Sequence, residues 1–276
     1  NYTRLETLPN IDINIKVGNS LVYQFDLNDD YKKLPANVKQ KIRMATQKYK
    51  EQVFLYKNTS DKITKGIIEA NIEKLKQSFK DISQSTDSIY LQKKKKEKEL
   101  GETPITFTKE ERVAWRRKAI QLAKDIKSLE QQYQEKVDTL YSNSLEWRFE
   151  FPEVLDENGN FVGFDLVVGN PPYIRQEKLD AELKHFYLKK FGNVGTGTAD
   201  IYVYFFGLAL QIAKPNNFIH FITLNKWLKT KYGKTLRTAL AKQNVLEIID
   251  FFELNVFESA STDSATTMFQ KMKNNS

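Results

Sequence analysis

The chain has 276 residues, of which 43 are Lys or Arg and 35 are Asp or Glu, so its formal net charge is +8 at pH 7. It has no cysteine and only two histidines, His185 and His220, which excludes disulfides, thiolate metal sites, a Cys nucleophile and multi-histidine metal centres. No apolar run approaches the ~18 residues of a membrane span and no secretory leader opens the chain, so we expect a globular, cytoplasmic protein without a bound metal.

The first predicted element is a strand. Ile11, Ile13, Ile15 and Val17 alternate with polar residues, a pattern that predicts one buried and one exposed face. The strand is followed by Gly18 and Asn19, where a loop would begin.

The middle of the chain carries the whole basic excess. Residues 28–148 contain 27 Lys and Arg against 18 Asp and Glu, a net charge of +9, and the remainder is close to neutral. Apolar residues at positions 68–82 and again at 119–140 follow the spacing of a narrow helical seam, and an earlier helix is expected over 37–56. The pattern predicts an antiparallel helical arm of coiled-coil character.

Breaks within this arm are also predicted. Thr108 and Glu111 form a capping-box signature that opens the second long helix. The run Lys93–Lys96, followed by Gly101 and Pro104, is expected to separate the two helices. The lysine run has two interpretations, a solvated turn at the tip of a helical pair or a set of phosphate contacts.

The flanks of the arm indicate an α/β fold. Strands and helices alternate, which is typical of a mostly parallel, doubly wound sheet. The chain is therefore divided into residues 1–27, a helical insertion over 28–148, and residues 149–276. Expected strands are 164–168, 218–224, 245–252 and 266–272, and expected helices are 179–190, 200–213 and 227–242.

The stretch that carries chemistry is Asn170-Pro171-Pro172-Tyr173, which follows an apolar strand and Gly169. Doubly wound sheets bind ligands at the carboxyl ends of their strands. Two prolines fix two φ angles and remove two backbone donors, so the loop presents acceptors beside the amide oxygen of Asn170 and the ring of Tyr173. The alternative interpretation is that these four residues form a rigid turn after the strand and have no functional role.

Such a corner suits an exocyclic amino group on a planar base. Acceptors that take both amino hydrogens favour a pyramidal nitrogen, whose lone pair is then free to attack an activated methyl group. Neither a covalent nucleophile nor a metal is needed. Methylation at carbon-5 of cytosine ordinarily requires a Cys nucleophile and is excluded here.

With its ordered companion segments, the Asn170–Tyr173 stretch resembles the N6-adenine DNA methyltransferases, and among them the modification part of fused type IIG restriction–modification enzymes. The segment from Glu146 to Glu153 is also typical of those enzymes. The resemblance implies a partial Rossmann-like methyltransferase sheet, S-adenosylmethionine as cofactor and duplex DNA as partner. By that match, Asn170 and the Pro171 carbonyl hold the adenine amino group, Pro172 completes the tetrapeptide, and Tyr173 stacks on the flipped base.

The resemblance also implies roles for residues outside the tetrapeptide. Asn19 and Ser20 lie in a segment similar to the one that contacts the cofactor adenine, although a turn cap would explain Asn19 equally. Phe205 would pack on the same ring, with core packing as the alternative. Phe257 would close the other face of the flipped base, unless it is a buried loop anchor. Asn170 completes the implied cofactor contacts.

One departure from the family pattern affects function. The glycine-rich Phe-x-Gly-x-Gly cofactor loop, its neighbouring strands and a target-recognition domain are absent from this sequence, so we expect part of a methyltransferase, inactive alone. Three alternatives remain: methylation of protein glutamine or RNA guanine, a DNA-binding helical module without activity of its own, and a helical oligomerisation arm.

Overall fold

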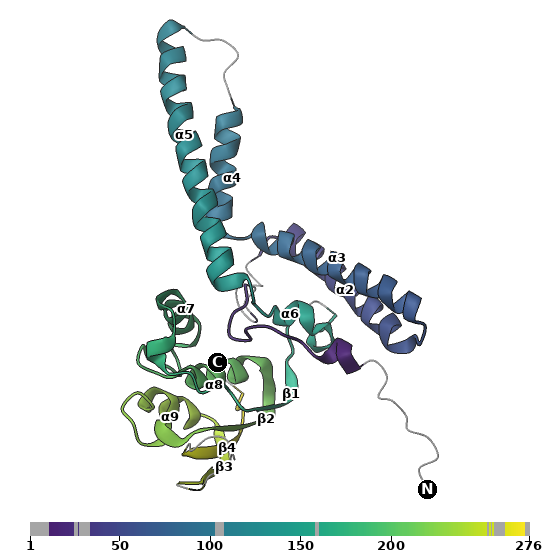
Figure 1. Ribbon diagram of the computed structural model, residues 1–276, viewed down its shortest axis with the longest axis vertical. Coiled ribbons are helices and arrows are strands. Elements are labelled where there is room, and N and C mark those ends of the chain that lie inside the picture. Colours follow the sequence, from purple (N-terminus) through teal and green to yellow (C-terminus); the bar gives the residue numbers. More distant parts are fainter. Residues whose placement is uncertain are drawn as a thin grey trace. The chain divides into compact units, whose positions relative to one another are not determined.

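The computed structural model describes residues 11–24, 27, 34–102, 108–157, 160–252, 254, 256 and 263–273. The chain forms two compact units, shown in Figure 1. The first comprises Asn1–Phe25 with Lys33–Pro152, and the second comprises Asp26–Lys32 with Glu153–Ser276. The N-terminal segment therefore clusters with the helical insertion. Among the described residues, no helix combines the length and hydropathy needed to cross a bilayer.

The first unit contains two helical hairpins (Figure 1). In one of them, α2 (Ala36–Asn58) and α3 (Lys62–Gln84) lie side by side. The Tyr56 hydroxyl donates to Glu69 at 3.0 Å across this pair. The apolar seam residues Ile68, Ile72 and Phe79 of α3 are buried. The helices predicted over 37–56 and around the seam at 68–82 are therefore confirmed.

The second hairpin pairs α4 (Ser88–Gly101) with α5 (Lys109–Lys136), which continues into a π-helical turn, η2 (Val137–Tyr141). The predicted capping box is present, because Glu111 N donates to the Thr108 hydroxyl at 3.2 Å and Thr108 N donates to the Glu111 carboxylate at 2.8 Å. Leu122 and Tyr133 are buried in the seam, so the second long helix is confirmed.

The lysine run is not a turn. Lys93–Lys96 lies inside α4, and two of its side chains form ion pairs across the hairpin. Lys93 pairs with Glu130, and Lys96 pairs with Asp125 at 2.7 Å. The prediction of a break at the lysines was wrong because lysine is a good helix former; α4 ends instead at Gly101.

A short helix, α6 (Trp147–Glu150), joins the insertion to the segment before it. The Trp147 indole N–H donates to the Ser20 carbonyl at 2.9 Å, and Gln24 N donates to the Glu146 carboxylate at 2.6 Å. Upstream of α6, Asn19 N donates to the Asn143 carbonyl at 2.6 Å. The chain thus leaves and re-enters the insertion at one point.

The same helix anchors the α2–α3 hairpin. The ring centroid of Phe149 lies 4.7 Å from that of Tyr49 and 4.4 Å from that of Phe79. The Glu150 carboxylate pairs with Lys16 at 3.1 Å and with Lys76 at 2.8 Å. One side chain of α6 therefore packs into the seam of the hairpin, and the next joins that hairpin to the N-terminal segment.

The predicted N-terminal strand is not formed. The structure has a 3₁₀ turn, η1 (Ile11–Asn14), followed by irregular chain in which Ile15 and Val17 are 67% and 88% exposed. Alternation shows that a segment can bury one face, but a strand also needs a neighbour for its backbone groups. No described strand pairs with this segment.

The second unit is an α/β unit, as predicted. Its sheet has the order β1-β2-β4-β3, with parallel pairing of β1 and β2 and antiparallel pairing on both sides of β4. Three of the four described strands run in the same direction, and β4 lies between two of them in the opposite direction. The strands are β1 (Phe164–Gly169), β2 (Ala213–Leu224), β3 (Asn244–Asp250) and β4 (Ser264–Gln270).

Helix α8 (Ile201–Ile212) packs on one face of the sheet. The ring of Phe206 contacts the rings of Phe221 and Phe269, which project from β2 and β4. β1 lies at an edge of the described sheet. Its Leu166 and Val168 side chains are 57% and 67% exposed, so it is not the buried strand that its apolar sequence indicates. The helices are α7 (Ala181–Phe191), α8 (Ile201–Ile212) and α9 (Lys234–Leu240), with 3₁₀ turns η3 (Pro152–Val154), η4 (Gln176–Lys178) and η5 (Asn225–Leu228).

We predict that Phe149→Ala destabilises the first unit by about 3–5 kcal/mol, because it removes the ring that fills the space between Tyr49 and Phe79. Urea unfolding followed by helical circular dichroism measures the change. Ile63→Ala, at a position that is 77% exposed on α3, is the control and should change the unfolding free energy by less than about 0.5 kcal/mol. Equal effects of the two substitutions would contradict the anchoring role of α6.

Candidate functional site

The predicted corner lies at the carboxyl end of β1. Gly169 is the last residue of the strand and pairs with Phe221 of β2. A Cβ atom at Gly169 would lie 2.9 Å from a ring carbon of Phe221, so only glycine lets the strand approach its neighbour here. After Gly169, Asn170 is exposed and Pro171 is buried. The amide side chain of Asn170 is accessible to solvent on a backbone that packing and two prolines hold in place.

The chain after the corner is fixed to the start of α8. Ile201 N donates to the Ile174 carbonyl at 3.0 Å, and Gln176 N donates to the Asp200 carboxylate at 3.1 Å. Between them and the prolines, Tyr173 is half-buried with its hydroxyl in the interior. Burial raises the pKa of Tyr173, and the Ser264 hydroxyl lowers it in part. The half-buried Tyr173 thus presents a ring at the corner with its hydroxyl in the interior.

Further polar groups gather at the same edge of the sheet. Asn225 directly follows β2, and Asp250 ends β3. The Asn225 amide donates to the Asp250 carboxylate at 2.8 Å, and Asn225 N donates to the Asp263 carbonyl at 2.9 Å. Because β4 is antiparallel, it begins at this edge, where Ser264 is fully buried. Three strands running in one direction thus place three polar loop starts on one side.

The Asp250 carboxylate is stabilised in its charged form. The hydrogen bond from Asn225 is the largest cause that lowers the pKa of Asp250, and the backbone N–H of Phe252 adds a second donor at 3.1 Å. Lys229 lies near and contributes in the same direction. The edge therefore carries a fixed negative charge beside the amide of Asn225.

The aromatic residues of α8 have different environments. Tyr202, Tyr204 and Phe206 are buried in the core, where the Tyr204 hydroxyl donates to the Thr196 carbonyl at 2.7 Å. Phe205 is only half-buried, so the core does not enclose it as it encloses its neighbours. This leaves part of the ring open to a ligand, and its contact with the cofactor stays a prediction.

Asn19 and Ser20 lie in the first unit, whereas Asn170, Tyr173 and Phe205 lie in the second. The Asn19 side-chain oxygen accepts from Leu21 N at 3.1 Å, which is the turn cap considered as the alternative. The Ser20 carbonyl accepts from Trp147. Both residues have a local structural role, and their contact with a cofactor is untested. Phe257 lies outside the described residues.

Sequence reasoning missed two residues of this edge, Asn225 and Asp250. A signal was present for the first, because Asn225 follows the end of an apolar strand just as Asn170 does. Asp250 could not be found in this way. Its partner is 25 residues away, and the pairing depends on the place of β4 in the sheet.

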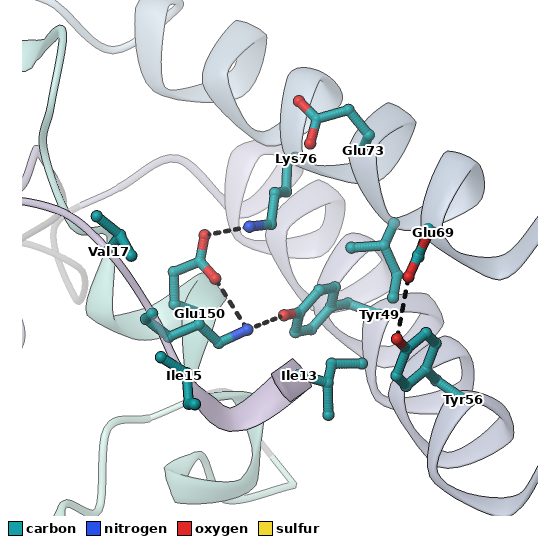
Figure 2. Close-up of a pocket in the computed structure, with 11 residues that line it drawn as sticks. Ile13, Ile15, Val17, Tyr49, Tyr56, Glu69, Glu73, Lys76 and Glu150 are labelled. Carbon is teal, nitrogen blue, oxygen red and sulfur yellow. Dashed lines mark hydrogen bonds and ion pairs between the residues drawn. The ribbon is translucent and has the colours of Figure 1, made fainter. Parts of the chain in front are cut away.

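A pocket of about 420 Å³ lies in the first unit, between η1, α2, α3 and α6 (Figure 2). Lys16 donates to the Tyr49 hydroxyl at 2.8 Å and pairs with Glu150, which also pairs with Lys76. Figure 2 shows the Lys76 side chain directed toward the Glu150 carboxylate. These contacts hold the N-terminal segment to the hairpin, so we assign this cluster a structural role.

The family of this chain is shown by comparison with known protein families. Residues 39–257, which include the insertion, the corner after β1 and the polar edge of the sheet, match the Eco57I restriction-modification methylase family. The chain belongs to this family. The match places the Asn170–Tyr173 corner and the polar sheet edge in a family of methylases.

Individual relatives cover less of the chain. It is 34% identical over 112 residues to the type II methyltransferase M.XhoI of Xanthomonas vasicola, covering 40% of this chain and 20% of that protein. It is 33% identical over 114 residues to M.BstVI of Geobacillus stearothermophilus, covering 41% and 20%. A solved structure of the type IIL restriction–modification enzyme MmeI with DNA matches at a TM-score of 0.34 and 18% identity, over 51% of this chain and 21% of that one. The chain thus spans about a fifth of these relatives' length.

We predict that Asn225→Ala raises the pKa of Asp250 toward its ordinary value, because the strongest donor to the carboxylate is lost. Carbon-13 NMR titration of the Asp250 carboxyl measures the shift. Asn244→Ala, which removes an amide at the other end of β3, is the matched control and should leave that pKa unchanged.

The lowered pKa of Asp250 also determines how the stability of the fold changes with pH. The Asn225–Asp250 bond stabilises the fold above the unfolded-state pKa of about 4, and this contribution is lost as pH falls through the lower folded-state value. Asn225→Ala should therefore make stability less dependent on acid pH. An unchanged pKa in Asn225→Ala would contradict the pairing.

Proposed function

We propose that the Asn170–Tyr173 corner is the methyl-acceptor site of a restriction–modification methyltransferase, and that its acceptor is the N6 amino group of an adenine in duplex DNA. S-adenosylmethionine is the proposed cofactor. The observation that carries this proposal is the exposed Asn170 beside the buried Pro171, on a backbone stiffened by two prolines at the end of β1, in a chain of this methylase family.

The chemistry follows from the acceptors at the corner. The lone pair of an aromatic amine is delocalised into its ring, which makes the nitrogen a poor nucleophile. The Asn170 amide oxygen and the Pro171 carbonyl oxygen would each accept one amino hydrogen, and these bonds strengthen as the nitrogen becomes pyramidal. Stabilisation that grows toward the transition state accelerates the reaction. When bound, S-adenosylmethionine supplies the activated methyl group.

Tyr173 is the residue proposed to hold the base. A base inside a duplex cannot reach a loop, so the target nucleotide must be extruded, and a flipped base is commonly held by stacking on aromatic side chains. The half-buried ring of Tyr173, whose hydroxyl lies in the interior, would offer a stacking surface. Phe257 is proposed for the opposite face of the base.

The cofactor contacts are proposed to come from more than this chain. Phe205 is partly accessible on α8, and Asn170 follows the end of β1. Asn19 already caps a turn, so its part would be to shape the loop. Because the chain spans about a fifth of its relatives' length, we expect the parent protein to supply the remaining contacts and the recognition of the DNA sequence.

We predict that Asn170→Ala abolishes methyl transfer by the full-length parent protein and leaves its circular dichroism unchanged. The reason is that no other described side chain of the corner carries an amide acceptor. Transfer of a tritiated methyl group to duplex DNA is the measurement, and Asn193→Ala, in an exposed loop, is the matched control. Wild-type turnover by Asn170→Ala would refute the acceptor site. Transfer to protein or RNA but not to duplex DNA would refute only the adenine substrate.

A second prediction separates the ring of Tyr173 from its hydroxyl. Tyr173→Ala should weaken binding of a duplex with an extrahelical adenine by about 1–3 kcal/mol, the usual contribution of base–aromatic stacking. Tyr173→Phe keeps the ring and should bind with nearly wild-type affinity. Fluorescence of 2-aminopurine at the extrahelical position reports the stacking. Equal affinities of the Ala and Phe variants would rule out stacking.

A further inference from the structure

The charged side chains of α5 divide into two sets. Those that face α4 are paired across the hairpin: Asp125 with Lys96, Glu130 with Lys93, and Lys118 with Glu99. Six other side chains are cationic and exposed, and none of these six has an ion-pair partner among the described residues; the exposed carboxylates of Glu110 and Glu135 belong to neither set. These six residues, Lys109, Arg112, Arg116, Arg117, Lys124 and Lys127, are called the basic face of α5.

The spacing of the basic face places it on one side of the helix. Lys109, Arg116 and Lys127 are separated by seven and then eleven residues, which correspond to about two and three turns. The buried seam residues Leu122 and Tyr133 lie on the opposite side. At 1.5 Å per residue, the face is about 27 Å long, equal to roughly eight base pairs of duplex DNA.

Few acidic groups oppose this face. Glu111 is engaged in the capping box, and Asp125 is paired with Lys96, which leaves Glu110 as the other acidic residue between positions 109 and 127. Residues 103–107, which precede the helix, carry no charge in the sequence. On α4, the exposed Lys95 adds a further cation. A solvated helix surface ordinarily mixes both signs of charge, whereas between positions 109 and 127 the six cations of the basic face stand against Glu110.

We propose that the basic face of α5 binds the sugar–phosphate backbone of duplex DNA, independently of sequence. The proposal rests on the proposed function, because that function supplies DNA as the partner of the parent protein. Regularly placed cations match the repeating phosphates, and three of the six are arginines, whose planar group can bind a phosphate through two hydrogen bonds. The face would hold the duplex while other parts of the parent read its sequence.

The structure argues against a membrane as the partner. An interfacial helix needs a continuous apolar face that enters the lipid, but the apolar side of α5 is occupied by α4. Val113 and Ile120 are the large apolar side chains exposed near the basic residues. The charge of the face, and not its apolar surface, is therefore the feature that a partner would recognise.

The test compares two quadruple variants of the whole chain that remove the same charge. Lys109→Gln, Arg116→Gln, Lys124→Gln and Lys127→Gln neutralise the basic face. Arg43→Gln, Lys48→Gln, Lys74→Gln and Lys80→Gln neutralise exposed cations of the α2–α3 hairpin and are the matched control. Because glutamine is a good helix former, both should keep the helical circular dichroism of the wild type. Fluorescence anisotropy measures binding to a labelled duplex of arbitrary sequence over a series of salt concentrations.

The basic-face variant should bind at least about tenfold more weakly near 0.1 M salt. Its plot of log K against log salt should be flatter by about 3.6, because four phosphate contacts are lost and each contributes about 0.9 to the slope. The control should change affinity by less than about threefold. Equal weakening of both variants, or of neither, would overturn the proposal. Loss of binding to phosphatidylserine vesicles, with DNA binding intact, would overturn it in favour of a membrane.

This result is independent of the methyl-acceptor site. The assay reads binding and not methyl transfer, so a flatter salt dependence would support the basic face even if Asn170→Ala retained activity in the parent. Conversely, an inactive Asn170→Ala together with equal binding by the two quadruple variants would support the acceptor site and overturn the basic face.

Discussion

The first unit depends on the anchoring of helix α6. Trp147 holds the segment before the insertion, Phe149 packs into the α2–α3 seam, and Glu150 pairs with Lys16 and Lys76. A helical insertion of about a hundred residues can leave and return at one point because the entropy of closing a loop grows slowly with length. The two ends of the insertion must be held together where the chain leaves and returns. Three side chains within the four residues of α6 make the contacts that do this. The Glu150 side chain is only 14% exposed, so water screens these ion pairs less than pairs on the surface.

The second unit depends on the direction of its strands. Because β1, β2 and β3 run the same way, their carboxyl ends meet at one edge, and the residues that follow them are brought together from distant parts of the sequence. Asn170 comes from the first of these ends, Asn225 from the second and Asp250 from the third. The sheet thus sets the chemistry of this edge, and the prolines at 171 and 172 only stiffen a corner whose place is already given.

Local patterns explain which parts of this structure are predictable from sequence. Helix periodicity and the Thr108 capping box depend on residues within one or two turns, and both predictions are confirmed. The corner after β1 could also be predicted from sequence, because its residues are contiguous and directly follow an apolar strand. Partners distant in sequence are not visible: the segment 11–17 alternates like a strand but has no described neighbour, and the bond between Asn225 and Asp250 joins two strand ends through the sheet. The prediction of a break at residues 93–96 was wrong because lysine is a good helix former, and two of these lysines also pair with carboxylates on α5.

The charges of α5 show how stability and binding can make different demands on one helix. Toward α4, each charge has a partner, because a partly buried ion without one costs free energy. On the outer face, stability alone would favour glutamates interleaved with lysines, since like charges four residues apart destabilise a helix by about 0.2–0.5 kcal/mol. Arg112 and Arg116 are such a pair. The basic face is therefore unfavourable for the stability of the free hairpin, because its cations repel one another. A polyanion bound along the helix would reduce this repulsion and would itself be attracted by the cations.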